Sequence, residues 1–221
     1  MVVLPDNASE ERVRLLELYG AEIVHSPGDQ GTNGAIEVAR RLSEDAYYFM
    51  PFQYGNPANP DAHYDGTGME IVRDLPEVTH FVAGLGTGGT LMGVGRRLRE
   101  HNPDVQVVAA EPELGELVYG LRSLDEGFVP PIFDPTAVDR KFLVGADEAL
   151  RATRELAERE GIFAGLSSGA VIHAARRVAE GLDEGHVICL LADGGWKYLS
   201  TEAWTADLEE AAKRVGETLW W

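Results

Sequence analysis

Residues 79–97 (THFVAGLGTGGTLMGVGRR) constrain the fold of this chain more than any other segment. A short apolar run breaks into the glycine loop, residues 84–90, and a helix-compatible segment follows. A strand that ends in such a turn before a helix gathers backbone N–H groups and the positive end of the helix dipole around one point. Glycines let the backbone approach a ligand closely, and Thr87 and Thr90 add hydroxyl donors. The segment therefore predicts a site for a phosphorylated ligand.

The charge balance narrows the choice of partner. The 221 residues include 19 basic and 37 acidic side chains, a net charge of -18. Such a surface repels nucleic acid and anionic membranes, which excludes both as expected partners. The single cysteine, Cys189, lies in the apolar run 186–192, and a buried unpaired thiol is typical of a reducing cytoplasm. The sequence shows neither a membrane span nor a signal peptide.

Apolar, strand-like runs alternate with helical periodicity, which predicts an α/β fold with a mostly parallel sheet. Asn7 with Glu10 predicts a capped helix that ends at Gly20. Besides the strand before the glycine loop, we expect strands at residues 1–4, 22–25, 47–50, 105–110 and 186–192. We expect further helices at residues 34–43, 147–160, 170–180 and 207–215, and loops at 51–60 and 112–142.

The opening strand has no element before it. Parallel strands need crossovers and covered faces, and a domain rarely begins inside one. We therefore expect that residues upstream are missing from this sequence.

The glycine loop also matches a dinucleotide fingerprint. Gly84, Gly86 and Gly89 have the G-x-G-x-x-G spacing, and Glu111 stands at the end of the next predicted strand. An NAD-binding Rossmann domain, with Glu111 on the ribose, fits these residues. The alternative is that the glycines only permit a tight strand-to-helix turn, although so many glycines beside two threonines exceed what a turn needs.

Residues 165–169 (GLSSG) match the nucleophile elbow of α/β hydrolases. That fold requires serine, acid and histidine in this order, and no histidine follows Asp193, so the hydrolase is excluded. A capped helix start is the alternative. The six histidines show no metal-ligand spacing, and no metal site is expected.

Arg122 stands in the long loop before SLDEGFVP. One interpretation is a solvated arginine in a surface ion pair. The surrounding Gly and Pro residues indicate instead a shaped loop, in which a guanidinium can bind a phosphate in bidentate fashion.

Four motifs stand in the order and spacing of one known family: QYGNPANP at 53–60, GTGGT at 86–90, GLSSG at 165–169 and YLST at 198–201. On these motifs the whole chain resembles the cysteine synthase family, pyridoxal-phosphate (PLP) enzymes of fold type II. Arg122 with LDEGFVP, the segment ADGGWKY and the Trp-terminated tail resemble the actinobacterial O-phosphoserine sulfhydrylase branch (CysM type) more narrowly. The resemblance implies a three-layer, doubly wound, mostly parallel sheet, here truncated.

The resemblance also implies how the cofactor is bound. Ser167 would face the pyridine nitrogen of PLP, with Ser168 as the neighbouring candidate. A neutral hydroxyl there leaves the nitrogen largely unprotonated, which favours β-elimination. The 5′-phosphate of PLP would be bound by Gly86, Thr87, Gly88, Gly89 and Thr90.

For the substrate, the resemblance implies that Gln53 contacts the carboxylate and that Arg122 recognises the phosphate of O-phosphoserine, in preference to O-acetylserine. In such an enzyme the leaving group departs by β-elimination, and sulfur adds to the aminoacrylate to form cysteine. In the narrower branch a thiocarboxylated sulfur-carrier protein would deliver the sulfur. The complete enzyme would be a cytoplasmic homodimer.

One departure from the family pattern is severe. The family's Schiff-base lysine lies in an N-terminal Ser-x-Lys-Asp-Arg motif that this sequence lacks, and Lys141, Lys197 and Lys213 stand in other contexts. We therefore expect residues 1–55 to be the remnant of an N-terminal domain and residues 56–221 the larger PLP-phosphate-binding domain. The chain alone would be inactive. A non-catalytic, partner-binding fragment is thus a second alternative, beside the NAD-binding domain.

Overall fold

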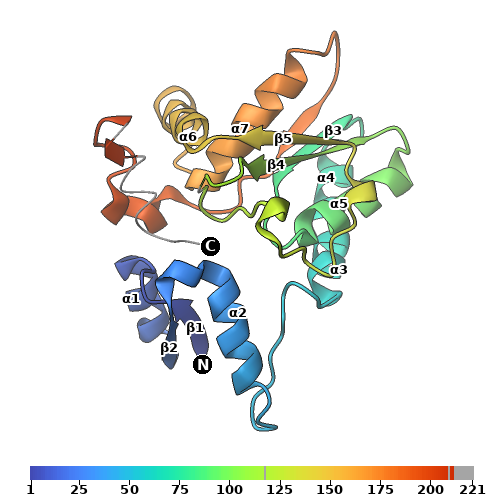
Figure 1. Cartoon of the computed structure of the whole chain (residues 1–221). Coiled ribbons are helices and arrows are strands. Elements are labelled where there is room, and N and C mark those ends of the chain that lie inside the picture. Colours follow the sequence, from blue (N-terminus) through green and yellow to red (C-terminus); the bar gives the residue numbers. More distant parts are fainter. Residues whose placement is uncertain (117, 209, 212–221) are drawn as a thin grey trace.

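A computed structural model describes residues 1–116, 118–208 and 210–211. They form two separate parallel sheets (Figure 1). The first sheet joins β1 (Val2–Pro5) and β2 (Ile23–Ser26), which pack with α1 (Glu10–Leu18) and α2 (Gly31–Leu42). We call residues 2–42 the small unit. The expected strands at 1–4 and 22–25 and the helix at 34–43 are confirmed, apart from their exact ends.

Local signals explain where α1 begins and ends. The Ser9 hydroxyl accepts a hydrogen bond from the Arg12 amide at 3.2 Å, so Ser9 is the N-cap. The predicted cap by Asn7 and Glu10 is wrong, because Glu10 is already the first helical residue. Gly20, at φ +75°, lies in the left-handed region that glycine adopts readily after a helix.

The second sheet has four parallel strands in the order β5–β4–β3–β6. They are β3 (His80–Gly84), β4 (Gln106–Pro112), β5 (Arg140–Val144) and β6 (Val187–Cys189). The expected α/β class with parallel strands is thereby confirmed. Strand β5 was not predicted, because most of its side chains are exposed and it follows a long irregular segment without an apolar signal of its own.

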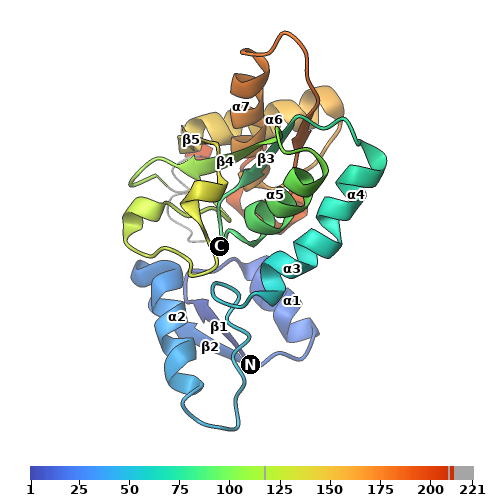
Figure 2. The ribbon, with the colours of Figure 1, turned by 90° about the vertical axis from the view of Figure 1, so that its right-hand side faces the viewer.

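Helices cover both faces of the four-stranded sheet, as Figures 1 and 2 show. One face carries α5 (Gly89–His101), against which α3 (Ala58–Asp65) and α4 (Thr67–Asp74) pack. The other face carries α7 (Leu166–Ala179), with α6 (Ala146–Glu160) beside it. This is the expected three-layer, doubly wound arrangement.

The period-2 alternation of strand β3 separates the two cores. Phe81 and Ala83 are buried among the apolar side chains of α5, while Val82 between them is buried among those of α7. All three side chains are fully buried. A strand that is apolar on both faces is typical of a central parallel strand, which places the glycine loop at the middle of the sheet's carboxyl edge.

The segment after the small unit differs from the prediction. Residues 47–50 form no strand, because the Asp45 carboxylate accepts a hydrogen bond from the Tyr47 amide at 2.9 Å and its carbonyl accepts one from the Tyr48 amide at 3.0 Å. These two bonds close a turn in place of a strand ladder. The expected loop 51–60 also ends early, since α3 begins within it, and neither α3 nor α4 was predicted.

Two other expectations need correction near the C-terminus. The helix expected at 170–180 begins earlier, at Leu166, so that the GLSSG motif lies at its first turn. Cys189 is half-buried on the edge strand β6 and not enclosed. The helix expected at 207–215 and the tail that ends in two tryptophans extend beyond the described residues.

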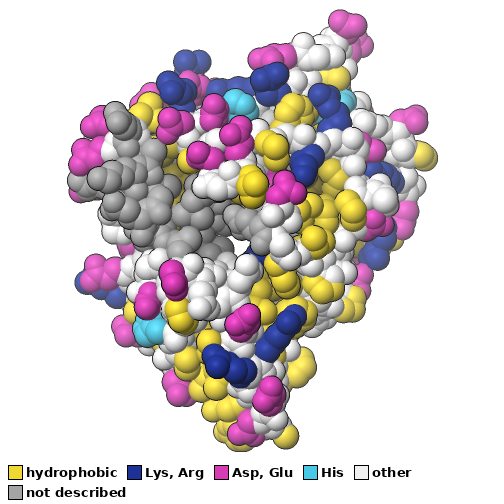
Figure 3. Space-filling view, in the orientation of Figure 1, with side chains coloured by type: hydrophobic (Ala, Val, Ile, Leu, Met, Phe, Trp, Pro, Cys, Tyr) yellow, Lys and Arg dark blue, Asp and Glu magenta, His cyan; other side chains and the backbone are white. Residues whose placement is uncertain are grey.

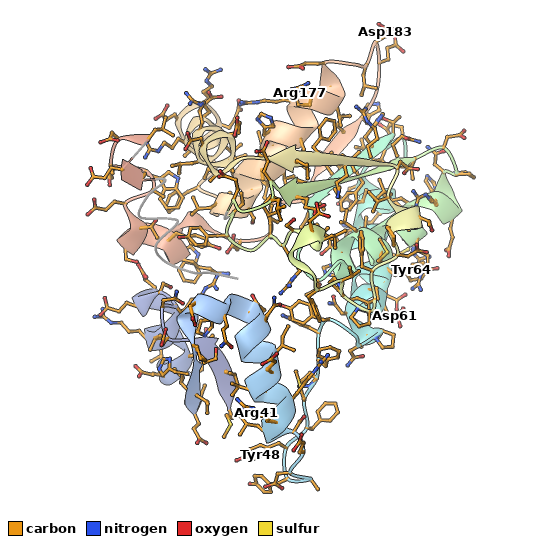
Figure 4. The ribbon with its side chains drawn as sticks, in the orientation of Figure 1. Arg41, Tyr48, Asp61, Tyr64, Arg177 and Asp183 are labelled. Atoms are coloured by element: carbon orange, nitrogen blue, oxygen red, sulfur yellow. The ribbon has the colours of Figure 1, made fainter. Side chains whose placement is uncertain are left out.

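An apolar groove of about 520 Å³ lies on the small unit, between β1, α2 and residues 48–54. Three exposed aromatic side chains, Tyr47, Tyr48 and Phe49, belong to this lining or adjoin it in sequence. Figure 3 shows hydrophobic side chains gathered at the lower tip of the molecule. Figure 4 shows Arg41 and Tyr48 at this tip, at the end of α2 that lies away from the larger sheet. No helix in the described part of the chain has the length and hydropathy to cross a membrane.

Candidate cofactor-binding site

The glycine loop lies at the carboxyl edge of the larger sheet, between Gly84, the last residue of β3, and Gly89, the first residue of α5. Gly88 has φ +85°, and a Cβ built on it would lie 2.8 Å from the Phe133 ring, so only glycine fits. The amides of Gly86, Thr87 and Gly88 donate to no protein acceptor in the described residues. These N–H groups at a helix N-terminus are available to bind an anion.

Asn59, at the start of α3, supports the loop from outside. Its amide nitrogen donates to the Thr87 hydroxyl at 3.0 Å and to the Gln53 carbonyl at 2.8 Å. A Cβ on Gly89 would lie 2.0 Å from the Asn59 side-chain oxygen, so this close approach requires glycine. Sequence reasoning missed Asn59 as a site residue, although the repeated Asn-Pro of the QYGNPANP motif was the signal.

Thr87 keeps one hydrogen for a ligand. Its oxygen accepts from Asn59 and from the Gly89 amide, at 3.2 Å, so the hydroxyl hydrogen is left to donate. The Thr90 hydroxyl lies 3.2 Å from Nε2 of His63, whose Nδ1 lies 3.1 Å from the Thr67 hydroxyl. Burial lowers the pKa of His63 below its ordinary value of 6.5, which favours the neutral ring at pH 7.

The two candidate serines lie in the first turn of α7. Ser167 is 6% exposed, and Ser168 is fully buried with a hydroxyl that has no hydrogen-bond partner among the described residues. Ser167 adjoins the glycine loop through Gly120: a Cβ on Gly120 would lie 3.6 Å from the Ser167 hydroxyl oxygen, and one on Gly86 would lie 3.0 Å from the Gly120 carbonyl. The fold thus brings the two predicted motifs together.

Arg122 is buried beside the same loop. Its side chain donates to the side-chain amide oxygen of Asn33, on α2, at 3.0 Å and lies against the rings of Phe128 and Tyr54, at 4.8 and 5.4 Å. It is 8% exposed and pairs with no carboxylate in the described residues. The interpretation as a solvated ion pair is therefore wrong. A buried cation without an anionic partner is suited to binding an anionic ligand.

Gln53 lies at the junction of these parts. Its backbone carbonyl accepts a hydrogen bond from the side-chain amide of Asn59, which also donates to Thr87. Its exposed side chain lines the apolar groove of the small unit. The structure therefore places its backbone close to the glycine loop, while its side chain makes no hydrogen bond to the loop among the described residues.

Glu111 is not placed to bind a ribose. Its carboxylate is fully buried and accepts hydrogen bonds from the Leu124 amide at 2.6 Å and the Ser123 hydroxyl at 3.4 Å, while Lys141 lies 2.8 Å from its other oxygen. A ribose-binding acid must reach the ligand, whereas this one is used inside the protein. This geometry removes the residue on which the NAD-binding alternative rested.

The observations agree with a phosphate monoester at the loop. The unpaired amides, the helix N-terminus and the Thr87 hydroxyl hydrogen fit a phosphate group. The buried serine hydroxyl nearby, which has no partner among the described residues, fits a polar ring atom at the other end of a cofactor. No group of three or more metal-ligating side chains occurs in the part of the chain that the structure describes. Fold and site together define a parallel α/β enzyme that binds a phosphorylated organic cofactor.

Comparison with known proteins names that class. A family model described as pyridoxal-phosphate dependent enzyme matches residues 1–194. The chain belongs to this family. A cysteine synthase of Staphylococcus aureus (strain Mu50 / ATCC 700699) is 41% identical over 214 residues, which cover 92% of this chain and 69% of the relative. The chain thus spans about two thirds of that relative's length.

Solved structures of proteins named as cysteine synthase and O-ureido-L-serine synthase are similar to this chain in fold. A cysteine synthase from Entamoeba histolytica is 30% identical with a TM-score of 0.84, covering 96% of this chain and 68% of that one. An O-ureido-L-serine synthase is 38% identical with a TM-score of 0.85, covering 93% and 68%. The chain therefore has the fold of type II PLP enzymes and is a PLP-dependent enzyme of the cysteine synthase type, a class of transferase in cysteine biosynthesis.

Proposed function

We propose that the glycine loop holds the PLP phosphate and that Ser167 faces the pyridine nitrogen. The phosphate would be bound by the free amides of Gly86, Thr87 and Gly88 and by the hydroxyls of Thr87 and Thr90. Gly89 would take part as the first residue of α5, whose amide orients the Thr87 hydroxyl. The unpaired amides beside the Thr87 hydroxyl are the observation that carries this assignment. Ser168, whose hydroxyl is buried and unpartnered, is the alternative ring contact. When bound, PLP supplies the electron sink that β-elimination requires.

We propose O-phosphoserine as the substrate, with Arg122 as the residue that recognises its phosphate. The guanidinium is buried and lacks an acidic partner in the described residues. Contacts with the rings of Tyr54 and Phe128 restrict its orientation, which favours bidentate binding of a dianion. A neutral acetyl ester gains no ion pair there, so O-acetylserine is the weaker substrate. Gln53, whose backbone carbonyl is linked to Thr87 through Asn59, is the proposed contact to the substrate carboxylate.

The small unit takes part in this recognition. Asn33 on α2 accepts a hydrogen bond from Arg122, so residues 1–55 would contribute to the substrate side together with Arg122 of residues 56–221, which would also bind the phosphate of the cofactor. A sulfur-carrier protein as the donor and a homodimeric enzyme complete the proposal for the whole protein.

Two lysines are already used in ion pairs. Lys141 pairs with Glu111 at 2.8 Å and Lys197 with Asp193 at 3.5 Å, so we infer that neither binds the cofactor aldehyde; Lys213 lies outside the described residues. The 221-residue chain by itself is accordingly proposed to bind PLP only weakly and to form no cysteine. Sustained cysteine formation from PLP, O-phosphoserine and sulfide would overturn this part.

The cofactor assignment is tested by equilibrium dialysis of the chain with PLP and, separately, with NADH. We expect binding of PLP alone, and about tenfold weaker binding in Thr87→Val, because a hydrogen bond to a charged group contributes roughly 1.5–3 kcal/mol. Thr205→Val, at an exposed position, is the matched control. Equal PLP affinity in both variants, or preference for NADH, contradicts the proposal.

A further inference from the structure

We propose that Glu111 is a positioning residue: it holds the backbone that carries Arg122 in a fixed place beside the glycine loop. The inference rests on the proposed function for the role of Arg122, and it assigns Glu111 a part in substrate selection that the sequence did not suggest.

The first observation is the burial of the Glu111 carboxylate. It stands near the end of β4 with no exposed surface, and one oxygen accepts from the Leu124 amide at 2.6 Å and from the Ser123 hydroxyl at 3.4 Å. Both donors belong to the two residues that directly follow Arg122. A carboxylate is costly to bury, so its hydrogen bonds fix the geometry of that segment closely.

Lys141 makes this burial tolerable. Its ammonium group lies 2.8 Å from the second Glu111 oxygen, and its side chain is 40% exposed, so the cation stays partly hydrated. Lys141 is on β5, the strand next to β4, which ties the carboxylate to the sheet as well as to the loop. The positive charge of Lys141 offsets part of the cost of burying the ionised Glu111 carboxylate.

Further hydrogen bonds tie Arg122 to the glycine loop. The Arg122 amide donates to the Leu85 carbonyl at 2.7 Å, and the Leu85 amide donates to the Ala110 carbonyl at 2.9 Å. Ala110 precedes Glu111 in β4. The bonds therefore close a ring: from Glu111 to Leu124, back along the chain to Arg122, across to Leu85 and then to Ala110.

The ring has a consequence for recognition. Leu85 begins the turn whose next amides are the proposed phosphate site of the cofactor, while Arg122 carries the proposed phosphate site of the substrate. Glu111 closes the ring that joins them, so it sets the distance between the two anion sites. Selectivity for a substrate of one length depends on that distance being rigid.

The experiment compares Glu111→Gln with Glu113→Gln in the full chain. Glu113 is two residues away, is exposed and its carboxylate makes no hydrogen bond within the described part of the chain, so it controls for the loss of one negative charge. Calorimetry with PLP present gives the affinities for O-phospho-L-serine and L-serine, and hydrogen exchange with peptide resolution follows residues 121–126.

We expect Glu111→Gln to reduce the preference for O-phospho-L-serine over L-serine about tenfold, as for loss of a hydrogen bond to a charged group, and to speed exchange at residues 121–126. Glu113→Gln should do neither. L-serine affinity should stay unchanged in both variants, which a general loss of structure would not allow.

Unchanged exchange and unchanged preference in Glu111→Gln would overturn the positioning role. A wild-type chain that shows no preference for the phosphorylated ligand would overturn the substrate proposal instead, and hydrogen exchange would still decide the role of Glu111. If Glu111→Gln does not fold, Glu111→Asp replaces it, because it keeps the charge beside Lys141 while withdrawing the oxygen from the Leu124 amide.

Discussion

At the scale of single residues, the candidate site depends on which side-chain hydrogens are already donated to other protein groups. Both amide hydrogens of Asn59 are used, one on Thr87 and one on the Gln53 carbonyl, and this commitment leaves the Thr87 hydroxyl as a donor. Arg122 has the opposite character: its partner is a neutral amide oxygen, which a stronger anionic acceptor can replace.

Replacing Asn59 should weaken cofactor binding. The Asn59→Asp side chain cannot donate a hydrogen bond to Thr87. It also places a negative charge next to the proposed phosphate site, which disfavours an anion there. We expect the dissociation constant for PLP to rise at least about tenfold, measured by equilibrium dialysis. Asp65→Asn, an exposed position on the same helix, should bind PLP as the wild-type chain does. An Asn59→Asp chain with wild-type affinity would refute the support role.

Asn33 offers a test of Arg122 that leaves the arginine in place. Asn33→Asp puts a carboxylate at hydrogen-bond distance from the guanidinium, where it competes with a substrate phosphate. Affinity for O-phospho-L-serine should fall about tenfold, while affinity for L-serine stays unchanged, both by calorimetry. Asn33→Ala removes the competitor and should bind at least as tightly as wild type. The assignment fails if both ligands respond equally.

At the scale of elements, α3 determines how the N-terminus of α5 is presented. The two helices pack closely enough that a Cβ on Gly93 would lie 2.1 Å from the Pro60 carbonyl. His63 bridges them by facing Thr67 and Thr90. Because its surroundings disfavour the charged ring, this contact should be pH-dependent.

Stability should fall as this histidine is protonated. Burial lowers the pKa of His63 in the folded chain below 6.5, so the unfolded chain binds more protons in the window just below that value. The free energy of unfolding therefore decreases as pH falls from 7 toward 5. Urea melts should show a smaller decrease for His63→Asn, whereas His25→Asn, at an exposed site, should follow wild type. An identical slope in His63→Asn contradicts this reasoning.

At the scale of the whole molecule, residues far apart in the chain hold the small unit in place. The Glu11 carboxylate on α1 accepts from the Ser200 amide and from its hydroxyl, both at 2.8 Å, across 189 positions of sequence. Ser200 belongs to the 3-10 segment Gly195–Thr201. Together with the hydrogen bond between Arg122 and Asn33, this contact joins the small unit to the rest of the described chain.

Removing the Glu11 contact should loosen the small unit. Glu11→Ala loses two hydrogen bonds to a carboxylate at a half-exposed position, so we expect about 1 kcal/mol less stability in urea unfolding. Hydrogen exchange should increase in residues 2–42 more than in β3 or α5. Glu17→Ala, exposed on the same helix, should change neither quantity. Equal effects of the two substitutions would show that the contact contributes nothing.

Short-range patterns were enough to predict much of this protein. The glycine loop, the flanking strand and helix and the parallel α/β class follow from residues close together in sequence, because turn chemistry and apolar periodicity act over a few positions. The cysteine synthase family was predicted from the resemblance of four motifs, between residues 53 and 201, to the pattern of that family. The assignments of individual site residues stay predictions that the experiments above address.

Other features depended on contacts between distant residues. Arg122 was compatible with two roles and Glu111 was expected to bind a ribose in the NAD-binding alternative, since burial and partners are not encoded next to them: Leu124, Lys141 and Asn33 reach them only in the folded chain. Strand β5 forms because its backbone pairs with that of β4. Helix α3 forms because it packs against α5. The local sequence determined the anion-binding turn, whereas the tertiary structure decided which charges stand beside it.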